Sequence, residues 1–185
     1  MTIILLVVLT VAAVVILLGV GIYNKLVQLR ENTKNGWSQI DVQLKRRHDL
    51  IPNLVETAKG YMAHERSTLE NVIKARQQAV DAKNLKDKQA AENFLSSTLR
   101  SLFAVSENYP NLKADQQMRL LHEELTSTEN KITFARQYYN DEVNRLNTAV
   151  QSFPDNVIAN MFNFGKRDFF ELEDASEKAA PQVKF

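Results

Sequence analysis

The fold of this chain is decided at its N-terminus by the stretch IILLVVLTVAAVVILLGVGI, residues Ile3 to Ile22. None of these residues is charged, and fifteen of them are Ile, Leu or Val. Twenty residues of α-helix extend about 30 Å, which is the thickness of the hydrocarbon core of a bilayer. The stretch therefore predicts a transmembrane helix.

Two other interpretations of the stretch fit less well. On the insertion scale the fifteen aliphatic residues far outweigh Thr10 and the two glycines, which favours a membrane span over a helix buried in a soluble core. A cleaved signal peptide normally has Lys or Arg before its apolar region and a small-x-small site after it. Only Met1 and Thr2 precede this stretch, and no such site follows Ile22. We therefore expect residues 1–23 to form a retained anchor.

Basic residues follow the span but do not precede it. Lys25, Arg30 and Lys34 lie within about a dozen residues of its end, with Glu31 as the nearest acid. The excess of Lys and Arg on one side of a span usually marks the cytoplasmic side. The sequence thus predicts a single-pass protein with its N-terminus outside and its C-terminal domain in the cytoplasm.

The composition of the remaining chain favours one helical domain, over residues 24–165. It is rich in Gln, Glu, Lys, Ala and Leu, and the whole chain has only five glycines and four prolines. All 23 basic and 22 acidic residues lie outside the span, so their charges nearly cancel. A nucleic acid partner is not expected, because such partners require a basic surface.

The clearest helical periodicity lies between Ala114 and Phe153, where one face recurs every three or four residues. We expect one long helix with Asp115 as its N-cap and Pro154 as its stop. Two polar residues, Thr128 and Glu142, interrupt the face, and we expect them to set register or to pair with a neighbouring helix. The full set is Met118, Leu121, Leu125, Thr128, Ile132, Ala135, Tyr139, Glu142, Leu146, Ala149 and Phe153.

A similar apolar face begins at Trp37 and continues to Met62. Arg47 and His48 stand where one further apolar residue is expected. No strong breaker separates this region from the span, so the transmembrane helix can continue directly into it. Pro52 should bend that helix, and Gly60 should end it.

Two further helices complete the predicted fold. One covers residues 68–82, with Ser67 and Glu70 as a capping box, and the other covers residues 87–108. Tyr109-Pro110-Asn111 predicts the turn into the long helix. The expected fold class is all-α: a transmembrane helix continuing into an antiparallel four-helix bundle of long helices, with packing like that of a coiled coil. A short C-terminal amphipathic segment and a flexible tail, residues 166–185, follow.

The short amphipathic segment holds Phe162, Phe164, Phe169 and Phe170 beside two basic residues. In an up-down-up-down bundle the fourth helix returns toward the membrane, so this segment would arrive near the bilayer. Its composition suits an element at the membrane interface. These side chains could equally close the end of the bundle core, and both interpretations remain open at this point.

Signatures of enzymes are missing from the sequence. It has no Gly-rich phosphate loop, no G-x-S-x-G elbow and no cysteine. His48, His64 and His122 are each isolated, and the Glu-x-x-His repeats of ferritin-like metal sites are absent. The sequence therefore predicts no catalytic residue, no cofactor and no metal site.

The densest polar cluster surrounds Arg46 and Arg47. These arginines could reach acids on the long helix, such as Glu124 or Glu129, in ordinary ion pairs. Alternatively Trp37, Arg46 and Arg47 could form a contact surface for a second copy or another partner, since Trp and Arg often anchor interfaces.

Two blocks of sequence closely resemble the bacterial LemA family. The first runs NGWSQIDVQLKRRHDLIPNLVET over residues 35–57, followed by KGY at 59–61 and HE at 64–65. The second comprises YPNLKA at 109–114, EEL at 123–125, TENKI at 128–132, AR at 135–136, YN at 139–140 and FPDN at 153–156. The resemblance covers essentially the whole chain. His48 stands where the family leads us to expect a small residue.

The resemblance implies one N-terminal span in the bacterial inner membrane and a cytosolic helical bundle, with no established biochemical activity. A relative in magnetotactic bacteria helps to shape or build a membrane organelle, and other relatives are often encoded beside a membrane metalloprotease. We therefore expect a non-enzymatic protein that self-assembles into a large homo-oligomer and organises or shapes the membrane. The alternative is an adaptor for a membrane protease or a signalling partner. The expected partners are the chain itself, the lipid bilayer and, for the adaptor, the protease.

Overall fold

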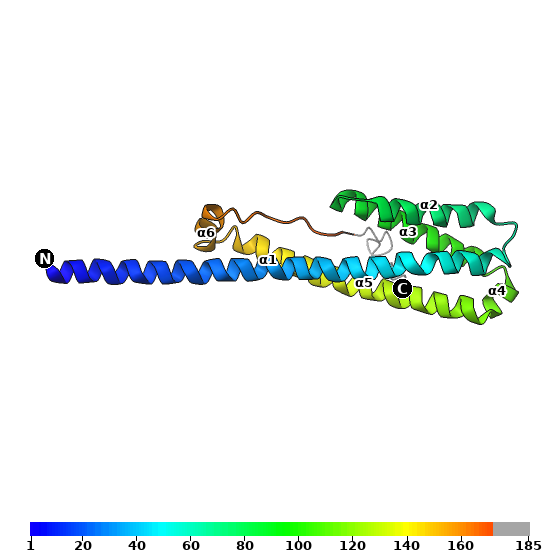
Figure 1. Cartoon of the computed structure of the whole chain (residues 1–185), viewed down its shortest axis with the longest axis horizontal. Coiled ribbons are helices and arrows are strands. Elements are labelled where there is room, and N and C mark those ends of the chain that lie inside the picture. The colour runs from blue at the N-terminus through cyan, green and yellow to red at the C-terminus, as the bar shows by residue number, and fades with distance from the viewer. Residues whose placement is uncertain (172–185) are drawn as a thin grey trace, which may run out of the picture. The chain divides into compact units, whose positions relative to one another are not determined.

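In the computed structural model, which describes residues 1–171, all regular secondary structure is helical and no strand occurs in that range (Figure 1). This confirms the predicted all-α class. Residues 172–185, which make up most of the predicted tail, lie outside the described residues. The helices are α1 (Thr2–Lys59), α2 (Arg66–Asp81), α3 (Leu85–Ser106), α4 (Pro110–Ala114), α5 (Gln116–Ala149) and α6 (Asp155–Met161).

The contacts within the chain group into two compact units. The anchor unit consists of residues 1–40 and 135–169, and the head unit consists of residues 41–134 with the described residues 170–171. Helices α1 and α5 contribute to both units, so each half of these helices is described with its own unit.

The predicted continuity of the first helix is confirmed, because α1 runs without interruption from Thr2 to Lys59. Its N-terminal part is the transmembrane candidate, and its C-terminal part belongs to the head unit. Pro52 lies inside the helix, and the helix ends at the residue before Gly60, as predicted.

The head unit is built around one apolar core that its helical segments share. The C-terminal half of α1 supplies the predicted face, and the N-terminal half of α5 runs antiparallel to it. Tyr61, just after α1, donates a hydrogen bond to Asp115 before α5, whereas Arg47 pairs with Glu129 further along α5. The core residues are Ile51, Leu54, Val55, Ala58, Met62, Leu69, Val72, Ala75, Ala79, Leu95, Leu99, Leu102, Leu112, Met118, Leu121 and Leu125.

The predicted face of α5 is buried at every position from Met118 to Ala149. Asp115 acts as the predicted N-cap, since its Oδ1 accepts a hydrogen bond of 2.8 Å from the Met118 amide. The prediction that Phe153 continues this face is wrong: the helix ends at Ala149, and the Phe153 side chain is 83% exposed. Turns occupy the residues between the helix and Pro154.

Two local predictions are wrong. Helix α2 begins at Arg66 with Glu65 as its N-cap and without a side-chain cap, so Ser67 and Glu70 already lie inside the helix and form no capping box. The predicted turn at Tyr109-Pro110-Asn111 leads into the short helix α4, in which Pro110 takes the first position. Proline suits that position because its missing N–H would have no helical partner there.

In the anchor unit, α6 and the C-terminal half of α5 pack against the N-terminal half of α1 (Figure 1). Leu26, Ala149 and Ala159 form the buried centre of this contact. Further along α1, Gly36 faces Tyr139, and Asn32 donates a 3.1 Å hydrogen bond to the buried carboxylate of Glu142. Glu142 therefore pairs with a neighbouring helix, as the sequence predicts.

Candidate functional site

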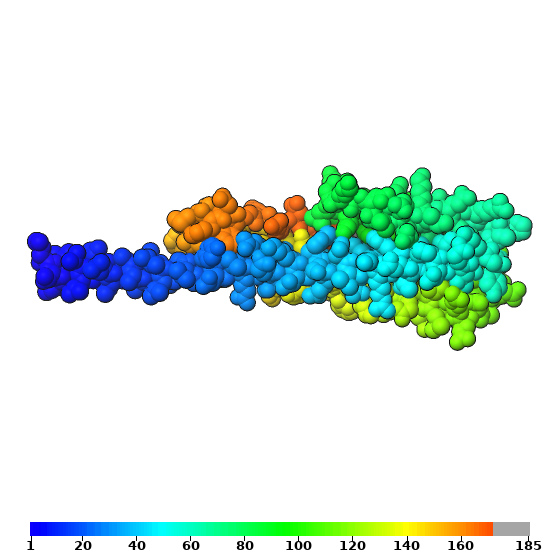
Figure 2. Space-filling view, in the orientation of Figure 1, coloured from blue at the N-terminus to red at the C-terminus, as the bar shows by residue number. Residues whose placement is uncertain are grey.

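The first candidate site is the apolar surface of α1. By length and composition, α1 is the one helix within residues 1–171 that could cross a bilayer, and no part of its most apolar window is buried. Residues 1–18 are exposed, and Figure 2 shows the N-terminal part of α1 extending without another described segment against it. A surface of this size and composition suits contact with acyl chains.

Helix α6 lies at the end of the predicted span. A Cβ built at Gly19 would stand 3.7 Å from Ile158 Cδ1, so α6 touches the last turn of the apolar stretch. Just beyond the span, Lys25 Nζ forms an ion pair of 2.5 Å with Asp155 Oδ2 at the start of α6. The sequence places these residues about 130 positions apart in the chain, and only the return of α5 brings them together.

The four predicted membrane-interface phenylalanines fall into different environments. The Phe162 and Phe164 rings pack edge-on against Tyr23, with centroids 4.8 and 5.7 Å away. Phe162 remains half exposed, whereas Phe164 is half-buried beneath the Arg30 guanidinium, 5.3 Å from the ring centre. Phe169 is exposed and Phe170 is fully buried. The structure thus groups Phe162 and Phe164 at the end of the span.

The segment after α6 is held against α5 through its backbone. Asn163 adopts a positive φ of 57°, a conformation that Asn tolerates better than most residues. The Asn147 side chain exchanges hydrogen bonds of 2.8 Å with the Arg167 backbone, and Tyr139 Oη donates to the Asp168 carbonyl at 3.0 Å. Residues 166–169 of the predicted tail are therefore tied to the anchor unit.

The three predicted self-association residues are also separated. Trp37 is half-buried, with its ring 5.6 Å from that of Tyr139. Arg46 is exposed and pairs with Glu124 at 2.5 Å, as the ion-pair interpretation predicts. Arg47 is only 1% exposed. Its guanidinium faces the interior of the head unit, so of the two arginines only Arg46 is available on the surface.

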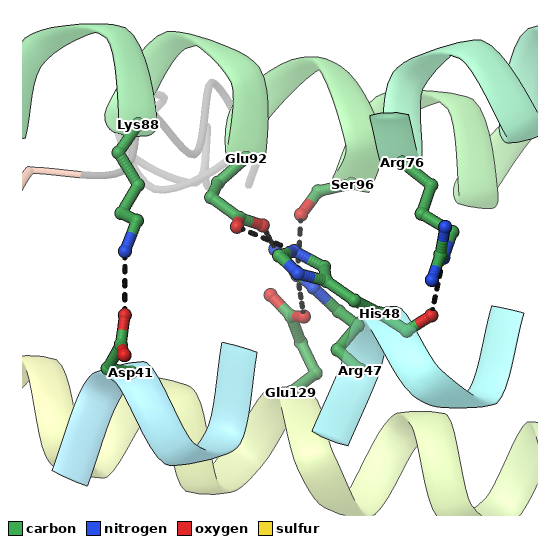
Figure 3. A network of polar contacts seen from close by, with 8 residues as sticks. All are labelled: Asp41, Arg47, His48, Arg76, Lys88, Glu92, Ser96 and Glu129. Atoms are coloured by element: carbon green, nitrogen blue, oxygen red, sulfur yellow. Dashed lines mark hydrogen bonds and ion pairs between the residues drawn. The ribbon is translucent and has the colours of Figure 1, made fainter. Parts of the chain in front are cut away.

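Arg47 is the centre of a buried polar network that joins α1, α3 and α5 (Figure 3). The guanidinium contacts the carboxylate of Glu92, which is fully buried, and it also donates to Glu129 at 2.5 Å and to Ser96 at 3.0 Å. His48 Nε2 donates to the other oxygen of Glu92 at 2.8 Å. An ionised carboxylate has no proton to give, so the imidazole must be the donor.

Two opposing effects act on the pKa of Glu92. Burial favours the neutral acid and would raise the pKa. The hydrogen bond from His48 and the positive charge of Arg47 outweigh burial, and they hold the pKa below its ordinary value. The network therefore contains a charged carboxylate whose ionisation depends on two residues of α1.

Pro52 completes the network from within α1. Proline has no N–H, so the carbonyl four residues earlier, that of His48, loses its usual helical partner. The Arg76 Nε from α2 donates to this carbonyl at 2.7 Å instead. The proline thus exposes a backbone acceptor that ties α2 to α1 beside the His48 side chain.

Glu92 is the residue that the sequence interpretation missed. It precedes Leu95 by three residues and Leu99 by seven, so it continues the buried face of α3. An acid on the face of one predicted helix and the Arg47-His48 pair on another form a signal that could have predicted this ion pair. Within residues 1–171, no group of three or more His, Cys, Asp or Glu side chains is arranged to hold a metal ion.

These features define a class of protein: an all-helical protein with one long apolar N-terminal helix and a polar network buried in its helical head. The LemA family profile matches residues 36–185, and the chain belongs to the LemA family. This confirms the resemblance inferred from the sequence motifs. The family match also supports association with a membrane.

The chain is similar to three magnetosome proteins. Magnetosome proteins MamQ 1 and MamQ 2 of Paramagnetospirillum magneticum are each 24% identical over 181 residues, covering 84% of this chain and 66% of the relative. Magnetosome protein MamQ of Magnetospirillum gryphiswaldense is 23% identical over 189 residues, covering 87% of this chain and 70% of the relative. The chain therefore spans about two thirds of the length of these relatives.

Proposed function

We propose that this chain is a non-enzymatic, membrane-anchored protein that self-assembles into a large homo-oligomer and organises or shapes the bacterial membrane. The observation that carries the proposal is the bare apolar surface of α1, which a single chain leaves exposed over residues 1–18. Lipid must cover this surface. Anchoring then confines all copies to one plane and raises their effective concentration, so that weak lateral contacts suffice for assembly.

The head unit offers such lateral contacts. Phe134 on α5 is 69% exposed, and uncharged Ser127 and Asn130 precede it on the same helix face. Lys131 is exposed on the same face, so the exposed aromatic ring itself marks this face as a candidate interface. On α1, Arg46 in the head unit and the exposed part of Trp37 in the anchor unit are further candidates. Likeness to magnetosome proteins supports this membrane role, as the family resemblance leads us to expect.

The proposed location is the inner membrane, with the N-terminus outside. Lys25, Arg30 and Lys34 after the span support this orientation. The structure adds that Arg30 lies over Phe164, beside Tyr23 at the end of the span. Aromatic and basic residues are common at the boundary between acyl chains and headgroups.

The mass of particles extracted in mild detergents, measured by mass photometry, tests the assembly. We expect masses many times that of the 21.1 kDa chain. The substitution Phe134→Ser should lower the mass, and deletion of residues 1–24 should weaken assembly. Phe94→Ser, the same change at an exposed site on α3, is the matched control. A sharply monomeric species in several detergents and in nanodiscs would reject the assembly and favour the adaptor function.

A further inference from the structure

Helix α6 carries apolar side chains on two of its sides. Ile158 and Ala159 pack toward α1, while Val157 and Met161, spaced by one helical turn, are exposed on the other side. Phe153, one turn before Val157, is also exposed. Asn156 and Asn160, also spaced by one helical turn, form a narrow polar strip beside the exposed apolar residues. An exposed apolar side flanked by polar residues is typical of a helix that lies at a membrane interface.

The position of α6 along α1 determines which neighbour is available. Ile158 contacts Gly19, which lies three residues before the end of the span, or about 4.5 Å inside it along the helix axis. Phe162, at the other end of α6, contacts Tyr23 just beyond the span. The outer side of α6 is therefore continuous with the lipid-facing surface of α1, at the depth where acyl chains meet headgroups.

The charges around α6 indicate the type of lipid. Its one acidic residue, Asp155, is neutralised by the ion pair with Lys25. Arg30 lies over Phe164, and exposed Lys166 and Arg167 follow Phe164 in the chain; these three basic residues outnumber the nearby acids Glu31 and Asp168. The local excess of positive charge suits a leaflet that contains anionic phospholipids.

We propose that α6 is an interfacial wedge, with Val157 and Met161 inserted among the acyl chains of the anionic leaflet next to Tyr23. This inference rests on the proposed anchoring of α1 in the bilayer. Because α6 adds volume to one leaflet, that leaflet expands relative to the other. The membrane then bends so that the side bearing α6 becomes convex, which supplies a physical means of membrane shaping.

Site-specific fluorescence in full-length protein tests the insertion. The chain has no cysteine, so Val157→Cys or Met161→Cys introduces a unique attachment site for an environment-sensitive dye. Asn35→Cys, an exposed site thirteen residues beyond Ile22 on the same helix, is the matched control. We expect spin-labelled lipids in vesicles of phosphatidylcholine and phosphatidylglycerol to quench the dye on α6, and aqueous iodide to quench only the control.

Two results would overturn the wedge. Quenching of the α6 dye by iodide to the level of the Asn35 control would mean that α6 lies in water. Protection from both quenchers would mean that a second copy of the chain covers the helix in place of lipid. Both sites on α6 are exposed, so labelling should leave the melting temperature unchanged, and agreement between the two labelled positions guards against a local artefact.

A second experiment tests the curvature. Full-length protein reconstituted at low density should be enriched several-fold per lipid area in small vesicles over large ones. The double variant Val157→Ser with Met161→Ser should lose this preference, whereas Val42→Ser with Leu120→Ser, two exposed sites in the head unit, should keep it. Equal density in both vesicle sizes would reject the bending role.

Particle mass, measured separately, distinguishes failure of the wedge from failure of the assembly. A large homo-oligomer with α6 in water would reject only the wedge. A monomer with α6 in lipid would reject only the assembly.

Discussion

Gly36 on α1 lies so close to Tyr139 on α5 that a Cβ at position 36 would stand 3.1 Å from the Tyr139 Cα. The two helices therefore meet backbone to backbone at this point of the anchor unit. Tyr139 also packs its ring against Trp37 and donates a hydrogen bond to the Asp168 carbonyl. One close contact thus positions α1, α5 and the segment that follows α6.

The substitution Gly36→Ala should destabilise the protein. In an exposed helix, replacing glycine with alanine stabilises the helix by about 1 kcal/mol. Overpacking typically costs about 1–3 kcal/mol, and here the obstructing atom belongs to the backbone of a long helix, which cannot easily move. We expect a net loss of about 1 kcal/mol, measured by thermal unfolding of the full chain in detergent. Gly60→Ala, where the nearest atom would lie 3.8 Å away, is the control, and a higher melting temperature for Gly36→Ala would contradict the prediction.

Shortening buried side chains on the α5 face should lower the stability of the head unit. Leu125 and Ile132 are both buried, so replacing either with Ala should lower stability by about 2–5 kcal/mol. Leu120 lies on the exposed side of the same helix, and its replacement with Ala should cost well under about 1 kcal/mol. Thermal or denaturant unfolding distinguishes the two sides, and equal effects at all three sites would show that the buried face is misassigned.

The Arg47–Glu92 pair should show strong coupling in a double-mutant cycle. Arg47→Ala leaves the carboxylate of Glu92 buried without its main counter-charge, and such losses typically cost about 3–5 kcal/mol. The double variant should cost clearly less than the sum of Arg47→Ala and Glu92→Ala, because it leaves no charge of the pair unpaired. The exposed pair Arg46–Glu124 is the matched control and should couple by less than about 1 kcal/mol. Additive losses at Arg47 and Glu92 would refute the coupling.

Stability should fall in acid because of Glu92. Its pKa is lower in the folded protein than the ordinary value of 4.5, so the folded state favours the ionised form more than the unfolded state does. The resulting stabilisation is fully present above pH 4.5 and is lost as the pH falls through the lowered pKa. We expect Glu92→Gln to reduce the slope of melting temperature against pH in this range. Identical slopes for the two proteins would assign the acid sensitivity to other groups.

Reporter fusions test the orientation of the chain. The basic residues Lys25, Arg30 and Lys34 predict that a reporter fused after Phe185 is active when it requires the cytoplasm. A reporter that requires the periplasm should be inactive at the same position. The reverse pattern would place the helical head outside and exclude the cytosolic topology.

The sequence alone determined the features that depend on local composition and periodicity. The span, the continuity of α1, the buried face of α5 and the Asp115 cap all follow from patterns within a few turns of helix. Local signals failed where tertiary contacts competed with them. The Ser67 capping box did not form, since α2 begins two residues earlier than predicted, next to Glu65, which accepts a hydrogen bond from Tyr109.

Which distant residues meet depends on how the helices pack against one another. Periodicity places Arg47 on the apolar face of α1, but it did not single out Glu92, and the pairing of the two residues depends on how α1 and α3 are aligned. In the same way, the sequence did not distinguish whether the phenylalanines contact lipid or close the bundle core. The return of α5 places Phe162 beside Tyr23, while Phe170 is buried. Such contacts join residues that are far apart in the chain, and no local pattern encodes their register.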